Sequence, residues 1–428
     1  MWWDFFEKIP ELIHIGWADL AKVFIGAFMV AFMALGWVRA IRKATKAQIA
    51  AEDHRREAEF EKERAEFHRE ISQLKSQHAE ELMRQREQVM EATRAQNEAE
   101  SEREKMATAL AALQRRLSDL ESFDGKLWEQ DNQAAPPAFV SSADRKTRFI
   151  SIVNLKGGVG KTTLTANIGV MLARKNHRVL LVDLDFQGSL TRLCTASGDQ
   201  LLELIQKRRT VARLFDDQTD PMLLHELINS VGHPNLVGQR CDFIAADEKL
   251  AEAELRAQAR WLITKTPDAR FLFRRFFHAQ AVLDRYDFVL FDCPPRLTTA
   301  CVNALGCSDF LLVPVLLEQG SVEALPRTLS WLHRLPHVSR ARLLGVIANR
   351  VDLYRGKPVS NQQTIFDYLP ETLKRSGFHE KAVFQAIVKN QRTLIEELAN
   401  QGKIAAADDE GASLFEDVTT EVEKGAQS

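Results

Sequence analysis

A glycine-rich loop holds the residues of this chain that are best suited to chemistry. The apolar run Phe149 to Val153 suits a buried parallel strand, and it leads into a loop with three glycines between positions 157 and 160. Glycines leave room for a phosphate group against bare backbone N–H groups, and the helix expected at residues 164–173 points its N-terminus at that anion. Lys161 would reach the β- and γ-phosphates, and the Thr162 hydroxyl would bind Mg²⁺. The spacing therefore predicts a loop that binds nucleotide phosphates.

Acidic residues follow two further apolar runs, at the strand ends where a parallel sheet binds its ligands. The run from Arg178 ends in Asp183 and Asp185, and a later run ends in Asp292 before Cys-Pro-Pro. Asp292 has the place of a Walker B aspartate, which would hold Mg²⁺ through water beside Thr162. Without the glycine-rich loop, Asp183 and Asp185 would more simply be a polar strand end.

The elements that position these residues alternate along the chain. From about residue 148 onward, apolar runs that suit strands are separated by helical stretches, with further strands expected at residues 309–318 and 343–350. Strands that alternate with helices predict an α/β fold with a doubly wound, mostly parallel sheet.

The run Lys156 to Thr163, Lys-Gly-Gly-Val-Gly-Lys-Thr-Thr, resembles the deviant Walker A loop of the ParA/MinD-type ATPases, which has a second, early lysine. The general pattern G-x-x-x-x-G-K-[ST] needs its first glycine where this chain has Leu155, so the full eight-residue match is to the deviant form. The resemblance covers about the last two-thirds of the chain. It implies a sheet of the P-loop NTPase type, ATP and Mg²⁺ as cofactors, and hydrolysis of ATP to ADP and phosphate.

The resemblance also implies a role for each matching residue. Lys156 and Lys161 would neutralise phosphate charge during catalysis, with Lys156 reaching across to the phosphates of a partner chain. Asp185 would orient the attacking water. The residues expected to bind the nucleotide are Gly157, Gly158, Val159, Gly160, Lys161, Thr162, Thr163, Asn349 and Arg350. The residues expected around the metal are Thr162, Asp183 and Asp292.

Two features of the sequence leave questions open. Asn349 and Arg350 stand where the family often contacts adenine, although Asn and Arg at a strand end are also ordinary turn residues. Phe186 follows Asp185 at a position where the family usually has proline. The loop would then move differently, and the rate of hydrolysis stays open.

Composition restricts the classes of partner and cofactor. The formal net charge is −2, so there is no global basic field that would indicate a nucleic-acid-binding protein. The five cysteines form no C-x-x-C pair and no zinc spacing, which predicts reduced thiols in the cytosol and no cluster of the nitrogenase-reductase kind. The bacterial tyrosine kinases share a related ATPase fold, but this chain has only three tyrosines and no tyrosine-rich tail.

Residues 1–39 predict an N-terminal membrane anchor. The uncharged run Val23 to Val38 would make about 24 Å of helix, which is short of the roughly 30 Å of a bilayer core. Extension back to Leu20 or Ile13 would supply the missing length, and basic residues from Arg39 onward place the following part inside. A buried core helix and an amphipathic segment on the membrane are the alternatives. The anchor predicts a single-pass protein of the inner (cytoplasmic) membrane, with its N-terminus outside and its ATPase domain in the cytoplasm.

The rest of the chain divides by composition. Residues 40–123 lack proline and glycine and repeat apolar residues at three–four spacing, which predicts a long helix that self-associates as a coiled coil. A solvated single helix is the alternative. Residues 124–147 predict a flexible linker because glycine, a proline pair and a serine pair interrupt them. The ATPase domain is expected at residues 148–405 and an acidic, disordered tail at residues 406–428.

Together these features predict a membrane-tethered ATPase switch. Its ATPase domains would dimerise on binding ATP and Mg²⁺, and slow hydrolysis would position or regulate a membrane-associated partner complex of unknown identity. Two alternatives stay open. One is a ParA-like partition ATPase that binds DNA nonspecifically, which the near-neutral charge does not favour, and the other is a coiled-coil scaffold that binds nucleotide with little turnover. The expected partners are a second copy of this chain, the membrane and an unknown protein, with DNA less favoured.

Overall fold

The computed structural model of this protein describes residues 21–27, 89–121, 126–129 and 135–427, except for 196, 217–219, 221–223, 237, 265, 336 and 402. The chain divides into two compact units, residues 1–105 and residues 106–428. In the first unit, residues 21–27 are helical and helix α4 (Val89–Glu121) begins. The strands described below all lie in the second unit.

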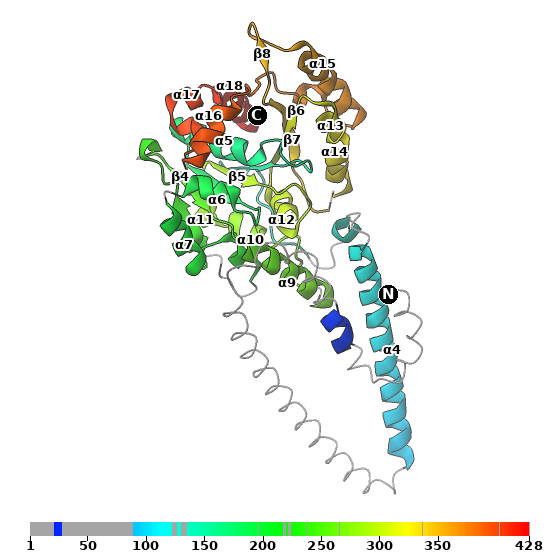
Figure 1. Cartoon of the computed structure of the whole chain (residues 1–428). Coiled ribbons are helices and arrows are strands. Elements are labelled where there is room, and N and C mark those ends of the chain that lie inside the picture. Colours follow the sequence, from blue (N-terminus) through cyan, green and yellow to red (C-terminus); the bar gives the residue numbers. More distant parts are fainter. Residues whose placement is uncertain are drawn as a thin grey trace. The chain divides into compact units, whose positions relative to one another are not determined.

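A seven-stranded sheet forms the centre of the second unit (Figure 1). Its strands lie in the order β3-β4-β2-β5-β1-β6-β7, and every neighbouring pair is parallel except β3 with β4. The strands are β1 (Arg148–Ile152), β2 (Val179–Asp183), β3 (Ile228–Ser230), β4 (Cys241–Ile244), β5 (Phe288–Asp292), β6 (Phe310–Leu316) and β7 (Arg342–Asn349). A separate antiparallel hairpin is formed by β8 (Leu353–Tyr354) and β9 (Lys357–Pro358). The strand order and the parallel pairing confirm the predicted doubly wound, mostly parallel sheet.

Helices and short 3-10 turns connect these strands. After α4, the α-helices are α5 (Lys161–Arg174), α6 (Ser189–Cys194), α7 (Gly198–Gln206), α8 (Leu224–Leu227), α9 (Lys249–Thr264), α10 (Arg274–Phe277), α11 (Gln280–Leu283), α12 (Thr299–Cys307), α13 (Gln319–Val322), α14 (Leu325–Arg334), α15 (Ser360–Arg375), α16 (Arg392–Asn400), α17 (Asp409–Ala412) and α18 (Glu416–Gln427). The 3-10 helices are η3 (Lys126–Glu129), η4 (Val211–Phe215), η6 (Pro234–Leu236), η7 (Glu380–Ala382) and η8 (Ala405–Ala407).

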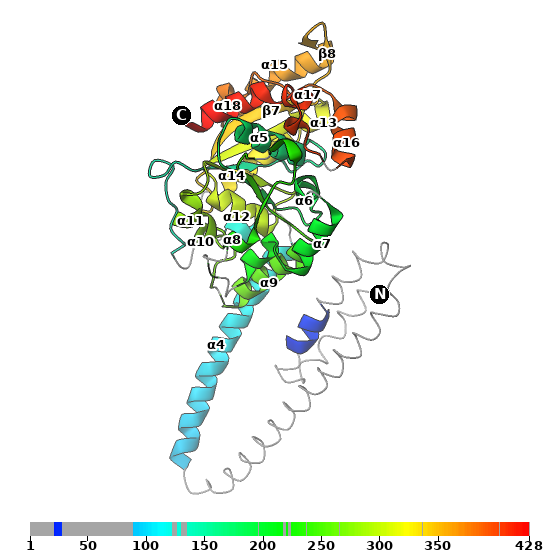
Figure 2. The ribbon, with the colours of Figure 1, turned by 90° about the vertical axis from the view of Figure 1, so that its left-hand side faces the viewer.

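Apolar runs form the strands because helices cover both faces of the sheet (Figure 2). Every residue of β2 and of β5 is buried. In β1, Phe149 belongs to one apolar cluster, whereas Ile150 and Ile152 belong to the other, as the two-residue period of a strand requires. Helices α9, α12, α14 and α15 contribute to the first cluster, and α5, α6 and α18 contribute to the second.

The predicted disordered tail at residues 406–428 is instead part of the domain. Its residues form α17 and α18, and Phe415, Val418 and Val422 are fully buried against the core. These apolar residues recur three and four positions apart, which is the stripe of a helix that packs on one face. The acidic composition hid this stripe, so the domain boundary expected at residue 405 was wrong.

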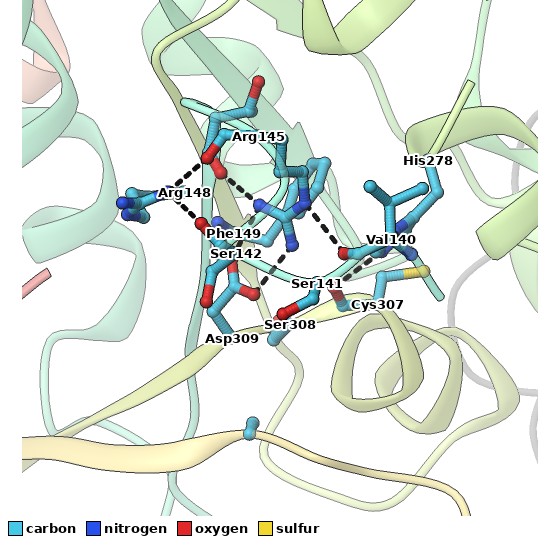
Figure 3. Close-up of polar contacts among 12 residues, drawn as sticks. Val140, Ser141, Ser142, Arg145, Arg148, Phe149, His278, Cys307, Ser308 and Asp309 are labelled. Carbon is cyan, nitrogen blue, oxygen red and sulfur yellow. Dashed lines mark hydrogen bonds and ion pairs between the residues drawn. The ribbon is translucent and has the colours of Figure 1, made fainter. Parts of the chain in front are cut away.

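The predicted flexible linker at residues 124–147 is also corrected where the structure describes it. In η3, Leu127 and Trp128 are buried in the first core cluster. Figure 3 shows how the later part is held: the Arg145 guanidinium donates to both oxygens of Asp309, at 2.9 and 2.7 Å. The Val140 N–H donates to Nδ1 of His278 at 3.0 Å. Composition indicated a linker because it carries no information on partners more than a hundred residues away.

The N-terminal predictions need a separate correction. Among the residues that the structure describes, no helix combines the length and the apolar character that a membrane span requires. Residues 21–27 are helical, and residues 1–20 and 28–38 lie outside the described part. This finding overturns the prediction of a single-pass inner-membrane protein with an outside N-terminus and a cytoplasmic ATPase domain. Residues 40–88 also lie outside the described part, so α4 confirms a long helix only from Val89 onward and self-association stays a prediction.

The Arg145–Asp309 pair yields a stability prediction, because both side chains are almost fully buried, at 2% and 4% exposure. Asp309→Ala leaves a buried guanidinium without its partner and removes the acceptor of the Phe149 N–H, so it should lower the free energy of unfolding by about 3 kcal/mol. Urea denaturation measures this change. Asp409→Ala is the matched control, because its pair with Arg174 is exposed and should contribute little. Equal effects of the two substitutions would contradict the assignment.

Candidate nucleotide-binding site

The glycine-rich loop runs from the carboxyl end of β1 to the first residue of α5. Gly158 and Gly160 have positive φ angles of 77° and 89°, a conformation that favours glycine. A side chain at Gly160 would overlap the Asn349 amide, whereas nothing lies within 4 Å of where a side chain at Gly157 or Gly158 would begin. The loop is therefore packed on its inner side and open on its outer side, where a phosphate group would meet backbone N–H groups.

The side chains of Asn349 and Asn154 hydrogen-bond to the backbone of this loop. The Asn349 Nδ2 donates to the carbonyl of Val159 at 2.8 Å, and its side chain is 3% exposed. Asn154 donates to the carbonyl of Pro314 at 2.8 Å and accepts the Lys156 N–H at 2.9 Å. The structure thus gives Asn349 a role in shaping the loop, while its contact with adenine stays a prediction. Asn154 was missed, although an asparagine directly at the end of a buried strand is itself a signal of side-chain contacts to the turn.

The two lysines of the loop lie in different surroundings. Lys161 is 7% exposed, and its Nζ donates to the Lys156 carbonyl at 3.1 Å across the loop. Burial lowers the pKa of Lys161, and the negative charge of Asp292 opposes that shift. The Lys156 side chain is more exposed, and its Nζ lies 3.9 Å from Oε2 of Glu318 in the same chain. The buried Lys161 side chain therefore links the two ends of the loop, whereas the Lys156 side chain lies at the surface.

Two buried carboxylates lie side by side where β2 and β5 end. Asp183 pairs in register with Asp292, and their exposures are 0% and 1%. Asp183 accepts the Thr191 N–H at 2.8 Å, the Thr191 hydroxyl at 2.7 Å and the Asp185 N–H at 3.1 Å. Burial is the largest cause that raises the pKa of both carboxyl groups. The charge of Asp183 raises the pKa of Asp292 further, and the charge of Asp185 raises that of Asp183. A positive ligand would relieve this repulsion.

The surroundings of Asp292 fit a magnesium ion. One of its oxygens, Oδ2, is buried and has no hydrogen-bond partner in the structure, and the Thr162 hydroxyl hydrogen-bonds to the same carboxylate. Mg²⁺ in phosphate sites is held by one or two carboxylates with waters and phosphate oxygens, so few protein ligands are needed. Thr162 and Asp292 would therefore hold the ion, and Asp183 would lie next to Asp292 on the neighbouring strand.

The two loops that follow these carboxylates touch each other. Asp185 is partly exposed and its Oδ1 accepts the Gln187 N–H at 3.0 Å. Phe186 is partly buried, and the Arg296 guanidinium lies 5.4 Å from its ring centroid. Arg296 was missed from the sequence, because only the structure places it beside Phe186. The structure therefore brings the glycine-rich loop, Lys161, Thr162 and the carboxylates together, and it leaves the Lys156 side chain at the surface. The contact of Arg350 with adenine stays a prediction.

Comparison with known proteins decides the family. Residues 147–343 match the AAA domain model AAA_31. The chromosome-partitioning ATPase Soj of Thermus thermophilus is 32% identical over 250 residues, which cover 58% of this chain and 83% of that protein. The chain belongs to the ParA/MinD-type P-loop ATPases. The sporulation initiation inhibitor protein Soj of Bacillus subtilis is 29% identical to this ParA/MinD-type chain over 280 residues, which cover 64% of the chain and 98% of the relative.

Other similarities of this ParA/MinD-type chain cover only part of a relative or concern the fold alone. An uncharacterized protein of Mycobacterium tuberculosis is 34% identical over 193 residues, which cover 45% of this chain and only about half, 54%, of that protein. Solved structures of Cyanothece McdA share the fold. Apo McdA has a TM-score of 0.52 with 19% identity, covering 65% of this chain and 99% of that one. The ATP complex of a McdA variant has a TM-score of 0.50 with 18% identity, covering 66% and 96%.

The packing of Asn349 yields a prediction on nucleotide binding. Asn349→Ala removes the donor to the Val159 carbonyl and opens space beside Gly160, so the loop should become less ordered and the affinity for ATP should fall about tenfold. Isothermal titration calorimetry measures this affinity. Asn400→Ala is the control, since Asn400 is the exposed last residue of α16. Unchanged affinity in Asn349→Ala would contradict this role.

Proposed function

We propose that this chain is an ATP-driven switch, in which ATP and Mg²⁺ join two ATPase domains and slow hydrolysis to ADP and phosphate separates them, so as to position or regulate a partner complex. The family supports a nucleotide-dependent ATPase. The observation that carries the proposal is the partnerless buried oxygen of Asp292 beside the Thr162 hydroxyl and the Lys161 ammonium. The carboxylate and the hydroxyl would bind the cation, and the ammonium would bind the phosphate that accompanies it.

Each residue of the site has a proposed task that follows from its position. The backbone N–H groups of residues 157–163 and the Lys161 ammonium bind the β- and γ-phosphates. Thr162 and Asp292 hold Mg²⁺, which would neutralise charge that develops on the phosphate oxygens. Asp185 orients the attacking water from its partly exposed loop. Asn349 shapes the loop, and Arg350, at the end of the same strand, is proposed to contact the base.

Lys156 carries the proposal of a dimer. Its pair with Glu318 is long and partly exposed, so that pair contributes little to stability and leaves the lysine free to move. In a face-to-face pair of domains, the Lys156 ammonium would reach the phosphates bound by the partner. ATP would then join the two domains because each nucleotide is bound by lysines from both.

Partition on DNA is a second candidate function. The chain is similar to the chromosome-partitioning ATPase Soj of Thermus thermophilus and to the chromosome partitioning protein ParA of Caulobacter vibrioides. A formal net charge of −2 offers no global attraction to DNA. Binding of the ATP-bound chain to DNA that weakens steeply with salt would favour this candidate, since released counterions give such a slope. A nucleotide-binding scaffold with little turnover is a third candidate, and it predicts negligible phosphate release.

Hydrolysis tests the site directly. Full-length wild type should release phosphate slowly and only with Mg²⁺, whereas Lys161→Ala and Asp185→Ala should each lower the rate by at least about a hundredfold. Lys207→Ala and Asp199→Ala are the controls, because both residues are exposed. Asp199 lies in the first turn of α7, and Lys207 directly follows its last residue. Phosphate release is followed by a coupled colour assay. Undiminished turnover in both site variants would rule out the assignment.

Dimerisation tests Lys156 separately. With ATP and Mg²⁺, Asp185→Ala should accumulate as an ATP-bound dimer, and adding Lys156→Ala should abolish this nucleotide-dependent dimer while ATP is still bound, because Lys161 and the loop remain. Light scattering with and without nucleotide measures the change in mass, so any association through the N-terminal helix is subtracted as background. A Lys156→Ala protein that still dimerises with ATP would exclude a role across the interface.

A further inference from the structure

A buried carboxylate on α9 lies against the start of α12. Glu254 is 9% exposed, and its Oε1 accepts the Ala300 N–H at 2.6 Å. The Thr298 hydroxyl also hydrogen-bonds to this carboxylate, and Thr298 caps α12 by accepting the Cys301 N–H at 3.2 Å. One turn further along α9, Gln258 donates to the Thr299 hydroxyl at 2.5 Å. Two side chains of α9 thus hold consecutive residues at the first turn of α12.

These contacts fix one end of the loop that follows Asp292. The other end is fixed by the sheet, because Asp292 pairs with β1 on one side and with β2 on the other. Only residues 293–298 lie between the two fixed points, and Pro294-Pro295 makes this segment stiff. The place where the loop enters α12 therefore determines where the loop lies.

Arg296 extends this constraint to the neighbouring loop. Its guanidinium lies 5.4 Å from the Phe186 ring, and Phe186 directly follows Asp185. A shift of the 293–298 loop would move Arg296 and disturb this contact. The position of the Asp185 loop consequently depends on the start of α12 and on the α9 side chains that hold it.

Helix α9 is itself anchored two turns beyond Glu254. The Trp261 ring stacks on Trp128 of η3, with centroids 6.3 Å apart and planes at 6°. The Arg270 guanidinium lies 5.0 Å from the Trp261 ring and donates to the Trp128 carbonyl at 3.2 Å. A helix that is held in this way at its far end presents Glu254 from a rigid support.

We propose that Glu254 is a positioning residue for ATP hydrolysis, whose ionised carboxylate holds the entry of the 293–298 loop into α12 and thereby places Arg296 and the Asp185 loop. This inference rests on the proposed ATPase function. Burial raises the pKa of Glu254 to about 7, and Asp185 raises it as well, while the hydrogen bonds from Ala300 and Thr298 and the charge of Arg296 lower it. A charged acceptor binds an N–H more strongly than a neutral one, so the hold on α12 weakens as pH falls through about 7.

Glu254→Gln tests the inference, because glutamine keeps the size of the side chain and removes the charge. We expect kcat at about pH 8 to fall tenfold or more, while the affinity for ATP changes by less than about twofold, because the phosphate loop is untouched. We also expect the wild-type kcat to decline as pH falls through about 7 and this decline to be absent in Glu254→Gln. Glu252→Gln is the matched control, since Glu252 is exposed on the same helix and pairs with Arg256. Glu254→Asp, which keeps the charge, should retain the pH-dependent decline.

The outcomes separate this inference from the proposed function. Lys161→Ala is measured in the same assay, and wild-type turnover no greater than that of Lys161→Ala contradicts the ATPase function itself. Wild-type turnover above that level, with kcat and pH profile unchanged in Glu254→Gln, overturns only the role of Glu254. Amide hydrogen exchange of Ala300 gives a readout that needs no hydrolysis: it should be faster in Glu254→Gln than in Glu252→Gln, and equal rates overturn the inference. Circular dichroism verifies that each variant is folded.

Discussion

Parallel pairing of β1 with β5 is the constraint on which the site depends. The register places Ile152 beside Asp292, so the glycine-rich loop leaves the sheet next to that carboxylate. On the other side of β5, Asp183 lies beside Asp292 in the same register. A slip of one residue would exchange the two faces of β1, so Phe149 would leave its apolar cluster and Ser151 would lose its buried hydrogen bond with the Ser308 hydroxyl at 2.7 Å. Packing of the core therefore fixes how far the glycine-rich loop lies from the carboxylates of Asp183 and Asp292.

The same register brings the carboxylates of Asp183 and Asp292 together, where they repel each other and are poorly solvated. Asp183 gains three hydrogen bonds from Thr191 and Asp185, which compensate its burial. Asp292 has fewer, and one of its oxygens has no partner. The nearby Lys161 ammonium offsets part of this cost, yet burial also lowers the pKa of that lysine. A cation and phosphates would satisfy these groups and so stabilise the folded site. Ligand binding and local stability are therefore linked.

The sequence predicted what depends on local patterns and missed what depends on distant contacts. The loop at residues 156–163 and the aspartates at strand ends follow from spacing, because a strand, a turn and a helix are short-range features. The packing of α18 was missed because acidic residues surround its apolar stripe. The Arg145–Asp309 pair joins residues 164 positions apart, and no pattern near Arg145 announces its partner. Glu254 was missed for the same reason, since its partners lie in α12.

The buried contacts before β1 also change where the ATPase domain begins. A domain cut at residue 148 would lose Arg145, which neutralises Asp309, and Trp128, which covers the ring of Trp261. The first loss would leave a buried carboxylate beside the Phe149 N–H, and the second would remove the ring that stacks on Trp261 near the end of α9. Because α9 also holds α12 through Glu254, the consequence would extend to the loop after Asp292. The segment before β1 therefore belongs to the structure that supports the nucleotide site, and the functional unit begins no later than Leu127.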